Sequence, residues 1–243
     1  MRNDLDRKFT EGTIVMYVVG HRGAAGVLPE NTVPGFEYAI DLGVTYLECD
    51  VHLTLDNHLV VMHDAKVDRT TNASGEIRDM TFETVRKLDA GDGAQVPTLD
   101  EVLALTKGKV TLLCELKGEG TEHAAVDAVK EHGMINEVVF TSFNTDRIQT
   151  VKKIDDKLSI GAILPSPSKA DIQKANDLGV VGFGVNYRNL CLWMVEEANA
   201  LGLDIRAWNP DTLPEQKAMI ALGVSGVSTN RPDILMAYLE KGD

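Results

Sequence analysis

The feature of this sequence that most constrains its fold is an alternation of short apolar runs with segments of helical spacing. Eight runs rich in Val, Ile and Leu are predicted to be β-strands, at residues 15–20, 45–51, 109–116, 137–142, 158–164, 180–185, 203–208 and 224–229. The segments that follow have the apolar spacing of helices, at 34–42, 98–106, 121–131, 144–154, 168–177, 190–201, 212–221 and 232–240. Glycines such as Gly43, Gly179 and Gly223, in "DLGV" and "ALGV", are expected to end several of these helices in a left-handed turn.

Eight βα units in one chain predict a closed barrel. An open doubly wound sheet usually has about five or six strands, so we predict an α/β fold of the (β/α)₈ TIM-barrel type. A polar, turn-rich stretch at about 64–97, between the second and third strands, is predicted to be a small insertion. We therefore expect a single domain over residues 16–243 and assign no function to residues 1–15, which could be a dispensable extension.

The charge balance and the cysteines exclude several classes of protein. Lys and Arg number 24 against 37 Asp and Glu, a net charge of -13, which repels nucleic-acid phosphates and anionic membranes. We predict no nucleic-acid partner and no stable membrane association. The apolar run near the start of the chain is too short for a signal peptide or a span. Cys49, Cys114 and Cys191 lie in apolar surroundings without metal-ligand spacing, which favours buried, reduced thiols in a cytoplasmic protein.

Acidic side chains stand on two of the predicted strands, at positions where a buried strand normally has apolar residues. Side chains alternate along a strand, so Glu48 and Asp50 share one face, and Glu115 and Lys117 share the corresponding face of the third strand. In barrels of this kind the carboxyl ends of the strands carry the active site. We therefore expect Glu48, Asp50 and Glu115 to converge there.

Two interpretations account for three converging carboxylates. Such groups repel one another unless a positive charge lies among them. All-oxygen ligation suits a hard divalent cation such as Mg²⁺ or Ca²⁺. Alternatively the acids form ion pairs with Lys117 and Arg206 and only fill the barrel. The spacing supports the metal site and the ion-pair network about equally.

The loop after the first strand, "GHRGAAGVLPENT", offers a second group of reactive side chains. His21 can exchange protons near neutral pH, and Arg22 can bind a phosphate through two parallel hydrogen bonds. His63 follows the apolar run in "HLVVMHD" and supplies a histidine at another strand end. Two histidines so placed suit general acid and base catalysis. The glycine spacing matches neither nucleotide-binding fingerprint.

Five segments together resemble the glycerophosphodiester phosphodiesterase family, of its cytosolic type. They are "VVGHRGAAGVLPENT", "LECDVHLTLDNHLVVMHD", "VPTLDEVL", "CELKG" and "GVSTNRPD", and they run from Tyr17 to the last helix. The resemblance implies a TIM barrel with an insertion after the second strand. It also implies metal-dependent hydrolysis of small, soluble glycerophosphodiesters to sn-glycerol 3-phosphate and an alcohol.

The resemblance assigns roles residue by residue. It implies one divalent cation, Mg²⁺ or Ca²⁺ with Mn²⁺ as an alternative, held by Glu48, Asp50 and Glu115. It makes His21 and His63 the general acid and base, without saying which is which. Arg22 and Lys117 would hold the phosphate, and Trp208 would flank the glycerol. Glu30 and Asn31 would brace the His21 loop by hydrogen bonds, and His52 and Asp64 would only orient their neighbours.

The sequence departs from the family at one position and leaves alternatives open. Asn230 stands in the last-strand motif where relatives commonly have Asp, which keeps hydrogen bonding and loses a charge. A lysophospholipase D-type activity on lysolipids would need an apolar docking rim, for which the sequence shows no segment. A non-catalytic phosphodiester-binding barrel is disfavoured because all five reactive positions are filled. The head group and the oligomeric state stay open.

Overall fold

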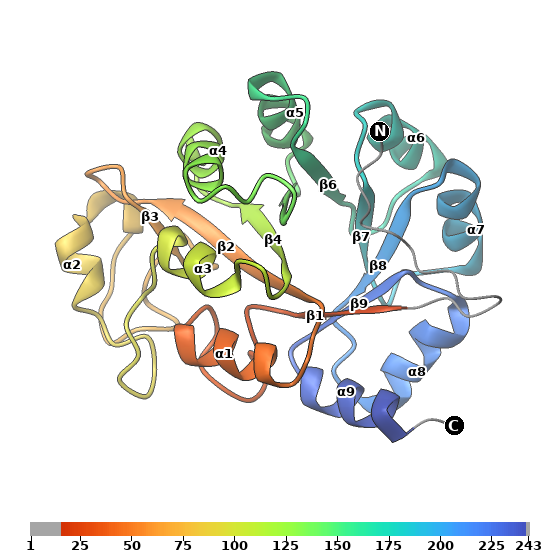
Figure 1. The fold of residues 1–243 in the computed structure, drawn as a ribbon, viewed down its shortest axis with the longest axis horizontal. Helices are drawn as coiled ribbons and strands as arrows, with labels where there is room; N and C mark the ends of the chain where they lie inside the picture. Colours follow the sequence, from red (N-terminus) through yellow and green to blue (C-terminus); the bar gives the residue numbers. More distant parts are fainter. Residues whose placement is uncertain (1–15, 242–243) are drawn as a thin grey trace.

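The computed structural model describes residues 16–241 and shows the predicted closed barrel (Figure 1). Its parallel strands are β1 (Tyr17–Gly20), β2 (Tyr46–Leu53), β4 (Thr111–Leu116), β5 (Val138–Ser142), β6 (Ser159–Ile163), β7 (Gly182–Asn186), β8 (Asp204–Trp208) and β9 (Gly226–Thr229). Each pairs with its neighbour in chain order, and β1 closes the barrel by pairing with both β9 and β2. The prediction of a TIM barrel is confirmed.

Helices follow the strands and cover the outside of the barrel. They are α1 (Val33–Asp41), α3 (Leu99–Thr106), α4 (Thr121–Glu131), α5 (Thr145–Ile154), α6 (Lys169–Asp177), α7 (Leu192–Leu201), α8 (Leu213–Leu222) and α9 (Pro232–Lys241). Local chemistry sets their ends. Thr98 and Glu101 form a reciprocal capping box at the start of α3, and Gly223 ends α8 in a left-handed conformation, as predicted.

The main core lies between the strands and the helices, and it decides which way the acids point. Leu47, Cys49 and Val51 of β2 are fully buried among helix side chains. Because side chains alternate along a strand, Glu48 and Asp50 face the barrel interior, as predicted. One prediction about the cysteines is wrong. Cys49 and Cys114 are buried, but Cys191 is exposed because it caps the start of α7 in a loop.

The strand β3 (Leu59–Val61), which the sequence analysis did not predict, adds an antiparallel hairpin to β2. Three residues are too short a run for strand periodicity to show. The hairpin turns the chain back along β2, so that Met62 donates a backbone hydrogen bond to the Asp50 carbonyl at 3.0 Å. This pairing returns the chain, and with it His63, to the mouth of the barrel.

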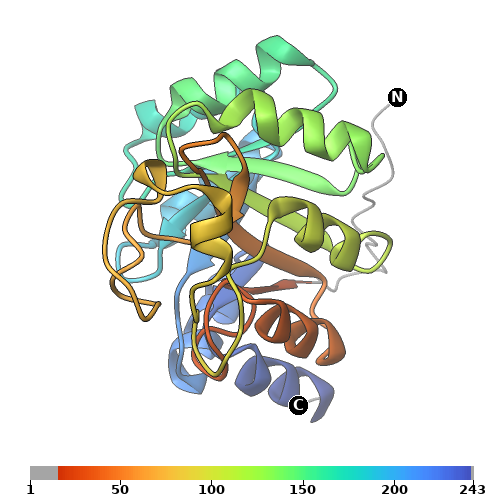
Figure 2. The ribbon, with the colours of Figure 1, turned by 90° about the vertical axis from the view of Figure 1, so that its left-hand side faces the viewer.

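The predicted insertion follows β3 and folds around a small core of its own. It contains the short 3₁₀ helix η1 (Ile77–Asp79) and helix α2 (Phe82–Arg86). Its apolar cluster consists of Val60, Met62, Val67, Ile77, Val85, Ala90 and Val96. In Figure 2 this segment, coloured gold, crosses in front of the barrel. The insertion thus packs on an apolar cluster that it shares with Val60 of β3 and with Met62, and it lies over one side of the barrel.

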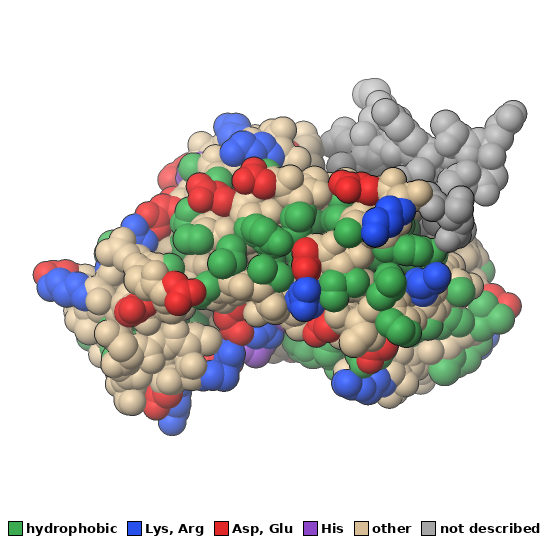
Figure 3. Space-filling view, turned by 90° about the horizontal axis from the view of Figure 1, so that it is seen from below, with side chains coloured by type: hydrophobic (Ala, Val, Ile, Leu, Met, Phe, Trp, Pro, Cys, Tyr) green, Lys and Arg blue, Asp and Glu red, His purple; other side chains and the backbone are tan. Residues whose placement is uncertain are grey.

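The outer surface mixes apolar and charged groups. On the face shown in Figure 3, hydrophobic side chains spread across the middle, with acidic and basic side chains scattered among them. The acidic surplus of the chain therefore forms no continuous patch on this face. Within residues 16–241, no helix combines the length and the apolar character that crossing a bilayer requires.

Candidate active site

Three buried carboxylates meet at the carboxyl ends of two adjacent strands. Glu48 and Asp50 come from β2 and Glu115 comes from β4, where Asp50 and Glu115 are register partners. The three residues are at most 6% exposed, and one ligand oxygen from each lies within 4.8 Å of the others. The structure therefore brings together the three acids that the sequence predicted would converge.

The three acids are electrostatically costly as they stand. Burial, together with the charges of Asp50 and Glu115, raises the pKa of Glu48 well above its usual range. Burial and the charge of Asp50 raise the pKa of Glu115 to about 7. The buried Asp50 Oδ1 accepts no hydrogen bond from any of the described residues. An all-oxygen set with such an unsatisfied buried oxygen fits a hard divalent cation.

Basic side chains neutralise only part of this charge. Lys117 Nζ lies 3.1 Å from Glu115 Oε1 and 3.9 Å from Asp50 Oδ1, and Arg22 Nε lies 3.5 Å from Asp50 Oδ2. Glu48 accepts a 2.9 Å hydrogen bond from the Arg22 backbone N–H, with no Lys or Arg side chain of the described chain in ion-pair range. The Arg206 guanidinium hydrogen-bonds Tyr17 instead of joining the acids. Of the two ion-pair partners that the sequence suggested for the acids, Lys117 forms such pairs and Arg206 does not.

His21 lies just after β1 and is held through one ring nitrogen. Its Nδ1 lies 2.6 Å from Asn230 Oδ1. The Asn230 amide nitrogen donates to Asp211 Oδ2 at 2.8 Å, which fixes the amide with its oxygen toward the ring. His21 Nδ1 therefore carries the hydrogen, and Nε2 lies 3.9 Å from Glu48 Oε2. Burial and then the charge of Arg22 lower the pKa of His21 to about 4, so the ring is uncharged.

His63 approaches the same space from the end of the β2–β3 hairpin. Its Nδ1 lies 2.6 Å from Asp64 Oδ1, and its Nε2 lies 3.0 Å from Lys117 Nζ. A carboxylate accepts and an ammonium donates, so Nδ1 carries the hydrogen and the Nε2 lone pair accepts from Lys117. His52 supports the loop, with its Nε2 3.1 Å from the His63 carbonyl. Two histidines thus present Nε2 toward one site.

The loop between β1 and α1 supplies further polar contacts. Asn31 donates to Asp50 Oδ2 at 2.9 Å, and Glu30 accepts from Arg22 Nη1 at 3.0 Å. Arg22 and Asn31 both have left-handed backbone conformations, with φ of 49° and 56°. Such strain in residues other than glycine is common at functional sites. Glu30 through its carboxylate, and Asn31 through its backbone N–H to the Arg22 carbonyl at 3.0 Å, both contact the His21 loop that they were predicted to brace.

A cavity of about 260 Å³ opens between these groups and the opposite side of the barrel. One side, the charged wall, comprises His21, Arg22, Glu48, His63 and Glu115. The other side, the aromatic wall, comprises Phe143, Ile163, Tyr187, Arg188 and Trp208. Trp208, predicted to flank the glycerol, lies on the aromatic wall with its ring centroid 6.0 Å from that of Phe143. The cavity therefore has a reactive side and a side that can only shape a ligand.

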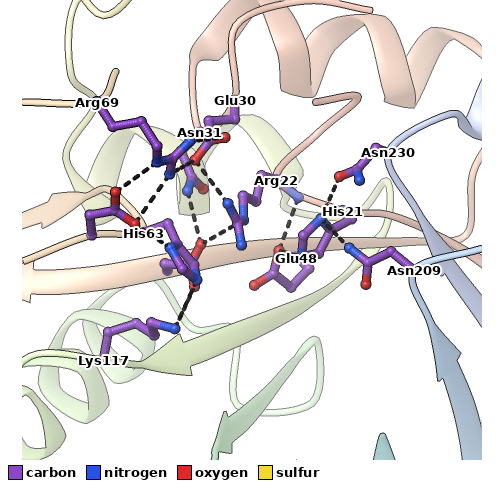
Figure 4. Close-up of polar contacts among 12 residues, drawn as sticks. His21, Arg22, Glu30, Asn31, Glu48, His63, Arg69, Lys117, Asn209 and Asn230 are labelled. Carbon is purple, nitrogen blue, oxygen red and sulfur yellow. Dashed lines mark hydrogen bonds and ion pairs between the residues drawn. The ribbon is translucent and has the colours of Figure 1, made fainter. Parts of the chain in front are cut away.

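Sequence reasoning missed three residues that support the histidines. Asn209 and Asp211 follow β8, and Asp211 holds Asn230. The Asn209 amide lies 2.7 Å from His21 Nδ1; because that nitrogen carries a hydrogen, the amide supports the ring when it is turned so that its oxygen, which has no other partner among the described residues, faces Nδ1. Arg69, in the insertion, binds both Asp64 and Glu30 (Figure 4). The only signal for Asn209 and Asp211 was their position at a strand end in "WNPD", whereas Arg69 lies in a stretch without periodicity.

Comparison of the sequence with known proteins identifies the family to which the chain belongs. The glycerophosphoryl diester phosphodiesterase family model matches residues 21–234. A glycerophosphodiester phosphodiesterase of Caldanaerobacter subterraneus subsp. tengcongensis is 35% identical over 238 residues, covering 93% of this chain and 98% of that protein. The chain therefore belongs to the glycerophosphoryl diester phosphodiesterase family.

Solved structures agree with the fold of this family. A phosphodiesterase of Oleispira antarctica, solved in complex with the product sn-glycerol-3-phosphate, has a TM-score of 0.87 and 25% identity, covering 92% of this chain and 96% of that one. A glycerophosphodiester phosphodiesterase of Agrobacterium tumefaciens has a TM-score of 0.81 and 26% identity, covering 91% and 99%. The barrel fold is thus shared with solved phosphodiesterases.

Proposed function

We propose that this protein hydrolyses glycerophosphodiesters to sn-glycerol 3-phosphate and an alcohol, using one divalent cation held by Glu48, Asp50 and Glu115. The observation that carries the proposal is the convergence of these three buried acids with His21 and His63 on one cavity. When bound, a divalent cation would neutralise charge on the phosphoryl oxygens and lower the cost of holding three carboxylates together. Mg²⁺ and Ca²⁺ suit the oxygen donors, with Mn²⁺ as an alternative.

The two histidines divide the proton transfers in this proposal. His21 is uncharged and has a free Nε2, which suits it to remove the proton of the attacking glycerol hydroxyl. The contact between Nδ1 and the Asp64 carboxylate orients the His63 ring with Nε2 toward the cavity, where His63 would act as the acid that protonates the departing alkoxide. The attack forms a cyclic phosphate and breaks the bond to the head-group alcohol. Water then opens the cyclic phosphate with the two roles reversed.

Basic and aromatic side chains would hold the substrate. Arg22 and Lys117 stand beside the acids, where they can bind phosphoryl oxygens; Lys117 would exchange its contact with His63 for one with the phosphate. Trp208 would pack against the glycerol carbons from the aromatic wall. Support for a small, soluble glycerol-containing substrate comes from the Oleispira antarctica structure, which binds sn-glycerol-3-phosphate. A cytoplasmic location is supported by Cys49 and Cys114, which are register partners and remain free thiols.

Product analysis with and without metal tests the proposal. Purified protein is incubated with glycerophosphocholine, glycerophosphoethanolamine and glycerophosphoglycerol in Mg²⁺, in Ca²⁺ or in EDTA, and the monoester formed is identified by ³¹P NMR. We expect sn-glycerol 3-phosphate in metal and none in EDTA. Full activity in EDTA would contradict the metal assignment, and phosphocholine as product would contradict the bond cleaved. Faster turnover of lysophosphatidylcholine would favour the lysophospholipase D alternative.

A further inference from the structure

Arg69 of the insertion joins two acids that belong to different loops of the site. Its Nε and Nη2 donate to the Asp64 oxygens at 2.7 and 3.2 Å, and its Nη1 and Nη2 donate to the Glu30 oxygens at 2.9 and 2.7 Å. One guanidinium therefore makes two bidentate contacts. Glu30 and Arg69 are 39 residues apart, so this contact joins the β1–α1 loop to the insertion (Figure 4).

Each of the two acids holds a residue that the proposed reaction needs. Asp64 Oδ1 lies 2.6 Å from His63 Nδ1, and Glu30 Oε1 lies 3.0 Å from Arg22 Nη1. The result is a chain of alternating charges that runs from Arg22 through Glu30, Arg69 and Asp64 to His63. Its two ends are the proposed phosphate ligand and the proposed proton donor. Arg69, at the centre, contacts neither the cavity nor the three metal-binding acids.

Stability of the fold does not account for this arrangement. The Arg69 side chain is 47% exposed, and exposed ion pairs contribute roughly 0–1 kcal/mol. What the planar guanidinium does supply is geometry, because its fork fixes the orientation of a carboxylate on each side. Without it, Asp64 and Glu30 would repel each other across the gap, and the His63 ring would lose the fixed position of its partner.

We propose that Arg69 is a positioning residue that sets the placement of His63 relative to Arg22, and so makes the insertion part of the catalytic apparatus. The inference rests on the proposed function for its kinetic consequence. It is also a statement about the His63–Asp64 hydrogen bond that holds whatever the substrate. A misplacement of about 1 Å can cost up to about 100-fold in rate, which sets the scale of the expected effect.

Arg86 offers a matched control in the same insertion. Its guanidinium also makes a bidentate contact with a carboxylate, donating to the Glu101 oxygens at 2.7 and 2.5 Å. That pair ties α2 to the start of α3 and contacts none of the site residues. A substitution of Arg86 therefore removes the same kind of ion pair from the same segment, without touching the proposed chain of charges.

The experiment compares Arg69→Ala, Arg69→Lys and Arg86→Ala in Mg²⁺, measuring kcat, KM and Tm, with free guanidinium added to each alanine variant. We expect Arg69→Ala to lower kcat at least tenfold with a smaller change in KM, and guanidinium to restore part of it. Arg69→Lys should stay below wild type, because an ammonium cannot pair with two carboxylates bidentately. Arg86→Ala should keep its kcat, with or without guanidinium.

A second readout does not require activity. The Nδ1 proton of His63, assigned by its absence in His63→Ala, should give a downfield ¹H NMR signal that weakens in Arg69→Ala and persists in Arg86→Ala. An unchanged signal in Arg69→Ala, or wild-type kcat in either Arg69 variant, would overturn the inference. The inference would also be overturned if Arg69→Ala and Arg86→Ala lost kcat to the same extent and guanidinium restored neither variant. A wild-type protein that turns over no glycerophosphodiester would instead overturn the proposed function, leaving the NMR comparison to decide this one.

Discussion

The two walls of the cavity are built on opposite principles. On the charged wall every side chain is held by named polar contacts, so that His21, His63 and Arg22 each have a partner that fixes their orientation. On the aromatic wall the contacts are between rings and cations: Phe143 meets Trp208 edge-on, and the Arg188 guanidinium lies 4.7 Å from the Tyr187 ring centroid. One wall is preorganised for chemistry by polar contacts, whereas the other is held mainly by packing, with the Tyr187 hydroxyl fixed by a 2.6 Å hydrogen bond that it donates to Glu215.

The largest expected effects come from the histidines of the charged wall. His21→Ala and His63→Ala should each lower kcat on glycerophosphocholine by about 10²- to 10⁴-fold, because each removes one proton transfer. His58, whose side chain is 53% exposed, is the control, and His58→Ala should keep its kcat. Steady-state kinetics of the three variants tests whether the charged wall carries the reaction.

The same variants separate acid from base. In a glycerophosphodiester with a p-nitrophenol head group, p-nitrophenolate leaves as a stable anion and needs no proton from the enzyme. The deficit of His63→Ala should therefore shrink strongly on this substrate, while that of His21→Ala should persist. Equal deficits on both substrates would contradict the assignment of His63 as the acid, and the reverse pattern would exchange the two roles.

A smaller loss of kcat is expected where a substitution changes the orientation of a histidine without removing it. Asn230→Ala removes the acceptor of His21 Nδ1, so the ring can adopt the other tautomer, with Nε2 protonated and useless as a base. We expect kcat to fall about 10- to 100-fold, as for other groups that orient reactive histidines. Asn144→Ala, which removes the N-cap of α5, should cost about 1 kcal/mol of stability and leave kcat unchanged. Similar kcat losses in the two variants would contradict this role of Asn230.

The contrast between the walls also shows how far sequence reasoning reaches. Alternation within a buried strand placed Glu48 and Asp50 inward, and the barrel rule placed Glu115 beside them, because strand geometry is regular. The partners that orient the histidines come from loops and from the insertion, where no periodicity links sequence to position. Asp211 and Arg69 were missed for that reason, and the short strand β3 was missed because three residues show no pattern. Trp208 lines the cavity because it ends a strand, and its contact with the glycerol stays a prediction.

When no metal is bound, the acids of the charged wall should make the stability of the whole protein fall as the pH rises. The Glu115 pKa is about 7 in the folded chain, against 4.5 as its ordinary value, so the folded state favours the protonated acid. The contribution of protonated Glu115 to the free energy of unfolding is therefore fully present below about pH 4.5. It is lost as the pH rises through 7, where the folded protein must ionise the buried acid. In EDTA we therefore expect Tm to fall on the order of 5 °C between pH 5.5 and 7.5.

Differential scanning calorimetry of the chelated protein, of the protein in Mg²⁺ and of Glu115→Gln checks this expectation. Mg²⁺ should remove most of the fall, because a bound cation compensates the ionised acids. Glu115→Gln should flatten the dependence in EDTA because it removes the titrating group. A chelated Tm that rises between pH 5.5 and 7.5 would contradict the proposed electrostatic cost of the three acids.

The smallest effects are expected on the aromatic wall, where a substitution should change the choice of head group and not the chemistry. Arg188 is exposed at the rim of the cavity, and its positive charge disfavours a cationic head group such as choline. Arg188→Glu reverses that charge in a solvated position. We expect the ratio of kcat/KM for glycerophosphocholine over glycerophosphoglycerol to rise about threefold, since about 0.6 kcal/mol is typical of an exposed charge contact. Arg78→Glu, at a 72% exposed position in the insertion, should leave the ratio unchanged. If Arg188→Glu instead lowered kcat equally for both substrates, the aromatic wall would take part in the chemistry, and the division between the two walls would fail.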